Sequence, residues 1–214
     1  MRIKADGGPQ PPNCRPGDSM KTLFAFVAAL ILALTASTQA LAVEASEAPG
    51  AKPLAVGTTF PDVPLIGPVS PELATSLGLP SQTGPSPINT VAADVLVVEI
   101  FSMYCPFCQR EAPTINALQA LIDKQTLGGR IKLIGIGAGN SDTEVDIYRK
   151  KFNVPFALFS DADFAVHQRI GQVGTPFFYV LRRKPAGYEI VMTHLGVIRS
   201  PTDFLAAITA KAGL

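Results

Sequence analysis

Cysteine, histidine and charged residues are scarce in this chain, and tryptophan is absent. The 214 residues include three cysteines and two histidines, and only 16% are Asp, Glu, Lys or Arg. A formal net charge of +1 gives no reason to expect a nucleic-acid partner. His167 and His194 are single and far apart in the sequence, so they do not supply the second ligand pair that a zinc site needs. We therefore expect neither a metal nor a cofactor.

One long apolar run is present, and it lies near the N-terminus. Residues 22–34 are apolar, follow Met20-Lys21, and lead to Ala40-Leu41-Ala42, which resembles a signal-peptidase site. The run is shorter than the ~20 residues that span a membrane. We predict a secretory signal segment at 1–42, in which 1–19 are either a long leading region or precede the true start at Met20. The expected location is periplasmic or otherwise extracytoplasmic, with a membrane tether if the segment is not cleaved.

Removal of that segment would take away Cys14 and leave Cys105 and Cys108, separated by two residues. An apolar run, residues 95–101, precedes this C-x-x-C, and an amphipathic stretch of about twenty residues follows it. Cys105 is then expected at a helix N-terminus, where free N–H groups and the helix dipole favour a reactive thiolate. Cys108 would lie one turn further on the same face. The pattern predicts thiol–disulfide exchange, and a purely structural disulfide is the weaker alternative.

The remaining chain predicts a lead-in at 43–57 and one domain at 58–214. Its apolar periodicity alternates strands with helices and ends in a hairpin and a last helix. This order indicates an α/β fold with a mixed central sheet and helices on both faces. The predicted strands are 95–101, 130–136, 154–159, 177–182 and 188–194, and the predicted helices are 71–77, 106–125, 142–152, 162–170 and 201–212.

A glycine-rich stretch, Gly135-Ile-Gly137-Ala-Gly139-Asn140, follows one predicted strand and precedes a helix. A dinucleotide-binding turn of the G-x-G-x-x-G type would need Gly at position 140, which is Asn140. We interpret the stretch as a small-residue turn between strand and helix.

The stretch Val173-Gly174-Thr175-Pro176 places a proline at the start of a strand after a glycine turn. With the C-x-x-C, it resembles the thioredoxin superfamily, and within it the TlpA/ResA-type thiol–disulfide oxidoreductases, over roughly residues 57–213. The resemblance implies a three-layer thioredoxin-like fold in which the Thr175–Pro176 bond is cis and packs against the cysteines. The Thr175 backbone would then pair with an extended substrate peptide.

Other positions match the same families. Glu99, six residues before Cys105, corresponds to the buried acid of thioredoxins, and Glu111 to an acid one turn down the helix in TlpA/ResA-type proteins. Residues 152–161 and 166–170 resemble the extra strand–helix unit that the subfamily carries between the C-x-x-C helix and the cis proline. A DsbA-type oxidase would need room there for a whole helical domain, which this chain lacks.

Two positions depart from the family pattern. Tyr104 stands where the family usually carries Trp, and Pro106-Phe107 lacks the His that stabilises the thiolate in some relatives. The missing His favours a reductase over a strong oxidant. We expect Tyr104, Pro106 and Phe107, together with Thr175 and Pro176, to form the substrate-binding surface.

The resemblance implies an enzyme that reduces disulfides in protein substrates. Cys105 would attack as thiolate, and Cys108 would resolve the mixed disulfide after losing its proton to Glu99 or Glu111. The implied partners are disulfide-containing proteins and a membrane thiol transporter that supplies electrons, and the expected state is a monomer.

Other functions stay open. An oxidase or isomerase would use the same residues with the opposite electron flow. A peroxiredoxin fits less well, because Ser102 rather than Thr lies three residues before Cys105. A copper carrier with Cys105, Cys108 and His194 as ligands belongs to a different class, since soft thiolates suit Cu(I).

Overall fold

The computed structural model of the protein describes residues 50, 52–80, 84–125 and 127–214. The predicted signal segment, Cys14 and residues 43–49 of the lead-in lie outside the described residues. The helices are α2 (Pro71–Leu77), α3 (Pro106–Lys124), α4 (Asp142–Phe152), α5 (Ala165–Arg169) and α6 (Pro201–Ala212). The strands are β1 (Thr59–Phe60), β2 (Pro64–Leu65), β3 (Ser86–Pro87), β4 (Val95–Phe101), β5 (Ile131–Ala138), β6 (Ala157–Asp161), β7 (Phe177–Lys184) and β8 (Gly187–Leu195).

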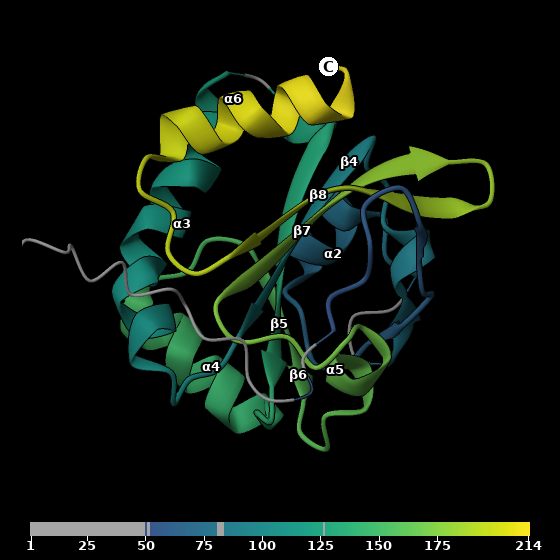
Figure 1. The fold of residues 1–214 in the computed structure, drawn as a ribbon. Coiled ribbons are helices and arrows are strands. Elements are labelled where there is room, and N and C mark those ends of the chain that lie inside the picture. The colour runs from purple at the N-terminus through teal and green to yellow at the C-terminus, as the bar shows by residue number, and fades with distance from the viewer. Residues whose placement is uncertain (1–49, 51, 81–83, 126) are drawn as a thin grey trace, which may run out of the picture. The chain divides into compact units, whose positions relative to one another are not determined.

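A six-stranded mixed sheet in the order β1-β8-β7-β4-β5-β6 forms the middle layer (Figure 1). β4, β5 and β6 are parallel, whereas β7 and β8 run antiparallel to their neighbours. β2 and β3 pair separately. The predicted mixed sheet is confirmed, and β6 with α5 forms the expected additional strand–helix unit at its edge.

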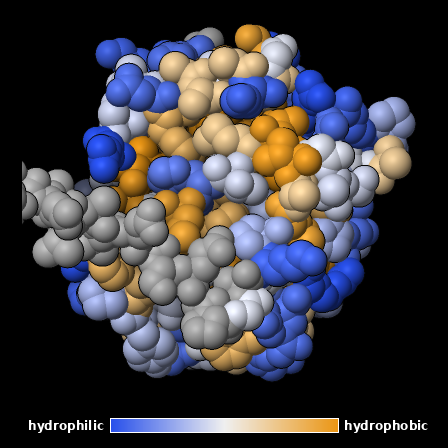
Figure 2. All heavy atoms as spheres, viewed as in Figure 1, coloured by the Kyte–Doolittle hydropathy of each residue, from blue (hydrophilic) through white to orange (hydrophobic). Residues whose placement is uncertain are grey.

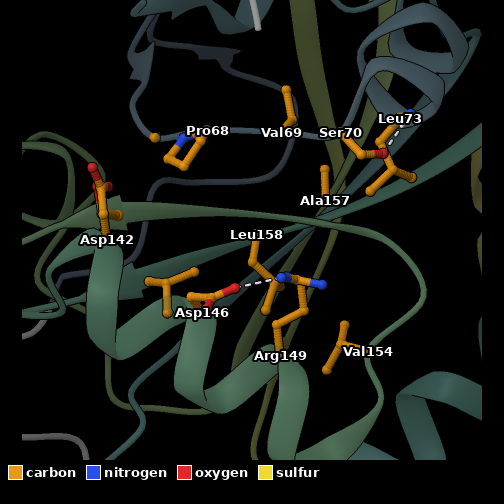
Figure 3. A pocket seen from close by; sticks show the side chains of 13 residues that line it. Pro68, Val69, Ser70, Leu73, Asp142, Asp146, Arg149, Val154, Ala157 and Leu158 are labelled. Carbon is orange, nitrogen blue, oxygen red and sulfur yellow. Dashed lines mark hydrogen bonds and ion pairs between the residues drawn. The ribbon is translucent and has the colours of Figure 1, made fainter. Parts of the chain in front are cut away.

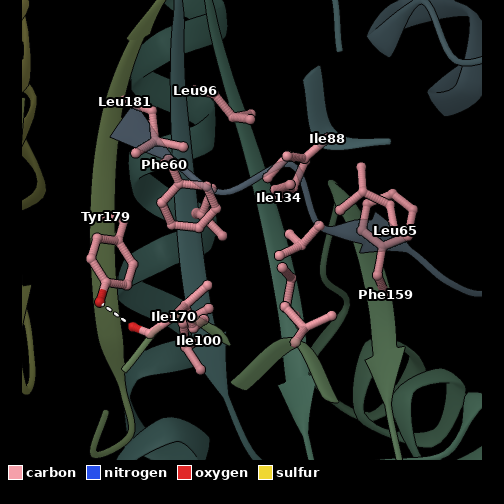
Figure 4. Packing of buried hydrophobic residues seen from close by; sticks show 14 of the residues in the cluster. Phe60, Leu65, Ile88, Leu96, Ile100, Ile134, Phe159, Ile170, Tyr179 and Leu181 are labelled. Atoms are coloured by element: carbon pink, nitrogen blue, oxygen red, sulfur yellow. Dashed lines mark hydrogen bonds between the residues drawn. The ribbon is translucent and has the colours of Figure 1, made fainter. Parts of the chain in front are cut away.

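Alternate residues of the buried strand β4 point to opposite faces of the sheet, as the period of two requires. Leu96, Val98 and Ile100 join a core that includes side chains of β1, β6 and β7 (Figure 4). Val95, Val97 and Phe101 join the second core, which contains buried side chains of α3, α4 and α6. Glu99 belongs by alternation to this second face, which is also the face of Cys108.

Capping chemistry sets the predicted helix ends. Ser70, Ser141 and Ser200 accept backbone hydrogen bonds at the starts of α2, α4 and α6, and Ser141 forms a capping box with Glu144. Gly78, with a φ of 65°, ends α2 in the left-handed conformation. The predicted bounds of these three helices are confirmed.

Several predicted bounds are corrected. β6 ends at Asp161 rather than at 159, and β7 at Lys184 rather than at 182. Three other corrections have a local cause. β5 continues to Ala138, because Gly135 and Gly137 lie in the strand, where their neighbours leave no room for a Cβ. β6 begins at Ala157 rather than at 154, after Pro155, which cannot donate to a ladder. α5 begins at Ala165 rather than at 162, because the Asp161 carboxylate accepts hydrogen bonds from the backbone N–H groups of Val166 and His167.

The last residues of the lead-in hydrogen-bond to the domain. The N–H of Lys52 donates to Gly171, and that of Gly57 donates to Ile190, both at 2.8 Å.

Polar and apolar residues are mixed on the face shown in Figure 2, with apolar side chains forming separate patches. Among the described residues, no helix is both long and apolar enough to cross a membrane.

Candidate active site

The two cysteines stand at the start of α3, where β4 ends. Cys105 is the N-cap of the helix, Pro106 is its first residue, and Cys108 is completely buried. Cys105 remains partly exposed, and both cysteines are free thiols. The side chain of Cys105 makes no capping hydrogen bond, so its sulfur is available to a substrate at the positive end of the helix dipole.

Two side chains form hydrogen bonds with the backbone of Met103, in the short loop before Cys105. The N–H of Met103 donates to the Asn140 side chain at 2.8 Å, and its carbonyl accepts from the Gln109 side chain at 2.7 Å. Asn140 is fully buried and follows the end of β5. Because the carboxyl ends of parallel strands meet at one edge of the sheet, Asn140 fixes the loop that carries the nucleophile.

The expected cis bond between Thr175 and Pro176 is present. The Cys105 thiol lies 3.3 Å from the Thr175 carbonyl oxygen and can donate to it. Two loops distant in sequence thus meet at the exposed sulfur. Thr175 precedes β7 by one residue, Pro176, so its backbone lies beside Cys105 at the edge where the strand begins.

Different degrees of burial and hydrogen bonding separate the two thiols chemically. Burial alone would raise the pKa of Cys105, but hydrogen bonds from the Thr175 side chain and from the backbone and thiol of Cys108 outweigh it and lower that pKa. Burial, together with the charges of Glu99 and Cys105, raises the pKa of Cys108 far above its usual range. Cys105 therefore loses its proton more readily than Cys108, and the thiolate is the nucleophilic form of a cysteine.

Glu99 is a buried acid beneath the cysteines, at only 2% exposure. Its neighbours in the sheet are Gly135 of β5 and Phe178 of β7, and its Oε1 has no hydrogen-bond partner among the described residues. Burial and the nearby charge of Glu111 raise the pKa of Glu99 to about 8. The alternative of an outward-facing, solvated Glu99 is excluded by this burial.

Glu111 is equally buried but is hydrogen-bonded. Its Oε1 accepts from the backbone N–H of Ile198 at 2.7 Å, in the loop between β8 and α6. Burial raises the pKa of Glu111 to about 7, although the Ile198 hydrogen bond opposes the shift. Both acids thus titrate close to neutral pH, as groups that exchange protons in an active site often do.

Asn140, Tyr148 and Glu144 are supporting residues that the sequence reasoning missed. The Tyr148 hydroxyl donates to the Cys108 carbonyl at 2.9 Å, and its ring lies 4.6 Å from that of Phe101. Tyr148 lies three residues after Val145 on the apolar face of α4, a spacing that predicts a core position. The signal that could have singled it out is its hydroxyl, since a buried Tyr hydroxyl needs a hydrogen-bond partner.

Aromatic side chains flank the exposed sulfur. Tyr104 is 64% exposed and Phe107 is 55% exposed. The Tyr104 hydroxyl donates to Glu144 near the start of α4, and the Arg110 guanidinium lies 4.6 Å from the centre of the Phe107 ring. These contacts fix both rings beside Cys105, in an arrangement suited to apolar contact with a peptide.

The histidine proposed as a copper ligand packs among aromatic rings. The His194 ring lies 5.4 Å from the ring of Phe204 and 6.0 Å from that of Phe178, and its Nε2 is 3.3 Å from the Val197 carbonyl oxygen. Within the described part of the chain, no group of three or more His, Cys, Asp or Glu residues is arranged to hold a metal ion.

A pocket of about 370 Å³ lies away from the cysteines, between residues 67–73 and the elements α4 and β6 (Figure 3). Its polar groups pair with one another: Asp146 with Arg149, and Asp142 with Ser160 at 2.5 Å. Neither Cys105 nor Cys108 lines it. The candidate site is accordingly an exposed surface around Cys105, which disulfide exchange with a protein requires, and not this pocket.

The comparisons with solved structures find the same fold in proteins of thiol chemistry. A structure described as the thiol:disulfide interchange protein DsbE of Chlorobium tepidum superposes with a TM-score of 0.57 at 16% identity, covering 74% of this chain and 98% of that one. The thioredoxin domain of a thiol-disulfide oxidoreductase from Bacteroides vulgatus gives 0.54 at 14% identity, covering 72% and 99%. Peroxiredoxin Q of Xanthomonas campestris gives 0.50 at 20% identity, covering 70% and 91%.

No family model and no curated protein sequence matches the chain. At identities of 20% or less, the structural likeness shows the fold, which is thioredoxin-like, as the resemblance of the sequence predicted. The chemistry of the site has to be argued from its own residues.

Proposed function

We propose that this thioredoxin-like protein is a thiol–disulfide oxidoreductase of the TlpA/ResA type that reduces disulfides in protein substrates. The observation that carries the proposal is the contrast between its two thiols. Cys105 is exposed, lies at a helix N-terminus and has a lowered pKa, whereas Cys108 is buried, protonated and close enough to interact with the charge of Glu99. A nucleophile and a resolving thiol differ in this way.

The proposed reaction has two steps. The Cys105 thiolate attacks a substrate disulfide, forms a mixed disulfide and releases one substrate thiolate. Cys108 then passes its proton to the Glu99 carboxylate and attacks the Cys105 sulfur, which releases the second substrate thiolate. The substrate gains two electrons, and the protein is left with a Cys105–Cys108 disulfide.

The order of the two steps follows from access. A substrate can reach Cys105 because it is partly exposed, but it cannot reach Cys108, which has no exposed surface. Glu111 is the second candidate for the proton, although its Oε1 already accepts from Ile198. Glu99 is the better acceptor, because its Oε1 has no partner and its charge interacts with Cys108.

The proposed setting is extracytoplasmic. The apolar run at 22–34 and the small residues up to Ala42 support export. A reductase in an oxidising compartment must be reduced again after each turnover, so we propose a membrane thiol transporter as the electron donor. The TlpA/ResA assignment, the monomeric state and the electron donor belong to this proposal.

Single-cysteine variants test the proposal. Cys108→Ser should trap a mixed disulfide between Cys105 and a protein substrate, visible as a covalent adduct that a reductant dissolves. Cys105→Ser should form no adduct, because Cys108 is buried. Equal adduct formation by both variants would contradict the assigned roles, and faster oxidation of a reduced peptide than reduction of its disulfide would reverse the proposed direction.

A further inference from the structure

Phe164 has an unusual backbone for a large residue. It lies in the turn between β6 and α5, and its φ of 60° and ψ of 19° place it in the left-handed region (Figure 1). A residue with a Cβ avoids this region because the Cβ crowds the following carbonyl oxygen. Yet the side chain is 45% exposed, so burial in the core does not explain why Phe is placed there.

The Phe164 ring packs against Gly139. A Cβ on Gly139 would lie 2.2 Å from the Cζ atom of Phe164, and Gly139 itself has a φ of 67°. The ring therefore lies directly against the backbone of the β5–α4 turn. The turn after β5 supplies Gly139 and the turn after β6 supplies Phe164. Both residues have a positive φ where they meet at this partly exposed ring.

The contacts of Phe164 lead to both loops that meet at Cys105. Gly139 precedes Asn140, whose side chain holds the N–H of Met103. On the other side, the His167 ring lies 5.7 Å from the Phe164 ring, and its Nε2 is 2.8 Å from the carbonyl oxygen of Val173. Val173 lies two residues before Thr175, so the residues that contact the ring connect it to both loops at Cys105.

Other exposed apolar side chains border the same loops. Seven large apolar side chains of the described residues are exposed, and four belong to this set: Tyr104, Phe107, Phe164 and Val197. Val197 follows Gly196, whose N–H donates to the Pro176 carbonyl at 2.8 Å. Apolar surface is thus concentrated where the proposed function would place a substrate.

We infer that Phe164 is a specificity-determining residue that binds an aliphatic or aromatic side chain of an extended substrate segment near its disulfide. The inference rests on the proposed function. An extended segment paired with the Thr175 backbone carries its side chains past the loops on either side of Cys105, so a chain with an apolar residue beside its cysteine can contact this ring. The fixed ring loses little conformational freedom when it binds, which favours affinity.

The occupant is a flexible, apolar segment rather than a small thiol compound. A small disulfide such as bis(2-hydroxyethyl) disulfide reaches Cys105 without touching the turn after β6. Discrimination by Phe164 should therefore appear only with peptides, and only with those that have an apolar residue near the cysteine.

The test uses the full chain and two peptides with an intramolecular disulfide, identical except for Phe or Ser beside one cysteine. Phe164→Gly removes the ring and suits the left-handed backbone, so the variant is expected to fold. We expect its KM for the Phe peptide to rise about tenfold at unchanged kcat, which matches the loss of one good apolar contact. Its kinetics with the Ser peptide and the small disulfide should stay as in the wild type.

Val56→Ala is the matched control, because Val56 is an exposed apolar side chain that precedes β1 at the opposite edge of the sheet. It should change neither peptide's KM. Equal effects of Phe164→Gly on the two peptides, or none on either, would overturn the inference while leaving the proposed function intact. A wild type that fails to reduce even the small disulfide would overturn the proposed function as well.

Discussion

Glu99 occupies an energetically unfavourable position for a carboxyl group, and that position bears directly on the proposed mechanism. A carboxyl group with one oxygen unpartnered in a sheet interior is unfavourable as an anion, and its pKa of about 8 means that it holds a proton at neutral pH. An apolar side chain would pack at this place without that cost. The acid therefore does not serve stability, and its place on the face of Cys108 supports the proposed role in proton transfer.

Replacing Glu99 with Gln should slow the second step of the reaction. Glu99 accepts a proton only when ionised, so the wild-type rate of resolving the mixed disulfide should rise as the pH passes through about 8. Glu99→Gln should lose that rise and resolve about a hundredfold more slowly above it. Stopped-flow measurement of the rate of mixed-disulfide resolution between about pH 5 and pH 9 tests this prediction. If the variant shows the wild-type dependence of that rate on pH, Glu99 has no part in the mechanism.

The same substitution should stabilise the reduced protein at alkaline pH. Because the folded-state pKa of Glu99 is raised from 4.5 to about 8, the folded protein keeps a proton that the unfolded chain releases, and stability falls as the pH rises across this range. Glu99→Gln should therefore be more stable than wild type by a few kcal/mol near pH 8 and about equal near pH 4. Urea unfolding at both pH values measures the difference, and a gap independent of pH would contradict the raised pKa.

Two substitutions of Glu111 should separate the effect of its charge from the effect of its hydrogen bond. Glu111→Gln keeps an acceptor for the Ile198 N–H but removes the charge that helps to raise the pKa of Glu99. It should lower the pKa of Glu99, as followed by carboxyl NMR titration, without loss of stability. Glu111→Ala leaves the buried N–H unpaired and should cost about 1–3 kcal/mol in unfolding free energy. Equal stability of the two variants would argue against the hydrogen bond.

At the scale of elements, the start of α3 depends on the turn after β5. Asn140→Leu preserves the size of the buried side chain but leaves the partly buried Met103 N–H without its acceptor. We expect a loss of about 1–3 kcal/mol in unfolding free energy, and a Cys105 pKa closer to that of an ordinary thiol, because its loop is no longer fixed at the helix end. Thiolate absorbance and urea unfolding provide the two readouts.

Gln119→Leu is the control for Asn140→Leu. Gln119 lies on α3 and its amide donates to Asp123 in an exposed pair. Its replacement should change the unfolding free energy by no more than about 0.5 kcal/mol. A similar loss in both variants would show that the role assigned to Asn140 is not specific.

Elements with strong local signals could be predicted from the sequence. β4 is apolar except for Glu99, and α2, α4 and α6 begin with serine caps, so their bounds follow from local chemistry. The extent of β5 could not be predicted, because Gly135 and Gly137 suggest a turn until the neighbouring Leu158 and Val145 side chains are seen to fill their space. Tertiary packing overrides the local preference there.

The candidate site also contains residues that the sequence predicted and residues that only the fold revealed. The C-x-x-C spacing and the Gly-Thr-Pro stretch identified Cys105, Cys108 and Pro176, because motif and chemistry coincide. Asn140 and Tyr148 act through single hydrogen bonds to a backbone 37 and 40 residues away. Pairings over such separations leave no periodic or spacing signal, so only the folded chain brings them to the site.

At the scale of the whole molecule, the sheet order explains why the site lies where it does. β4 is central, and its carboxyl end leads to the start of α3, while β7 begins beside it at Phe177, directly after Pro176. The proposed nucleophile, acid and peptide-binding backbone thus lie on or next to adjacent strands, with a core on each face of the sheet. This scaffold serves reductases, oxidases and peroxidases alike, so the fold does not set the direction of electron flow.

The reduction potential of the Cys105–Cys108 couple tests the central claim most directly. The protein would be equilibrated in glutathione buffers of known ratio and the fraction of dithiol measured after alkylation. We predict a potential near or below about −220 mV, in the range of thioredoxins and glutaredoxins, as a disulfide reductase requires. A potential near −120 mV, like that of the strong periplasmic oxidant DsbA, would contradict the proposed direction and make the protein a donor of disulfides.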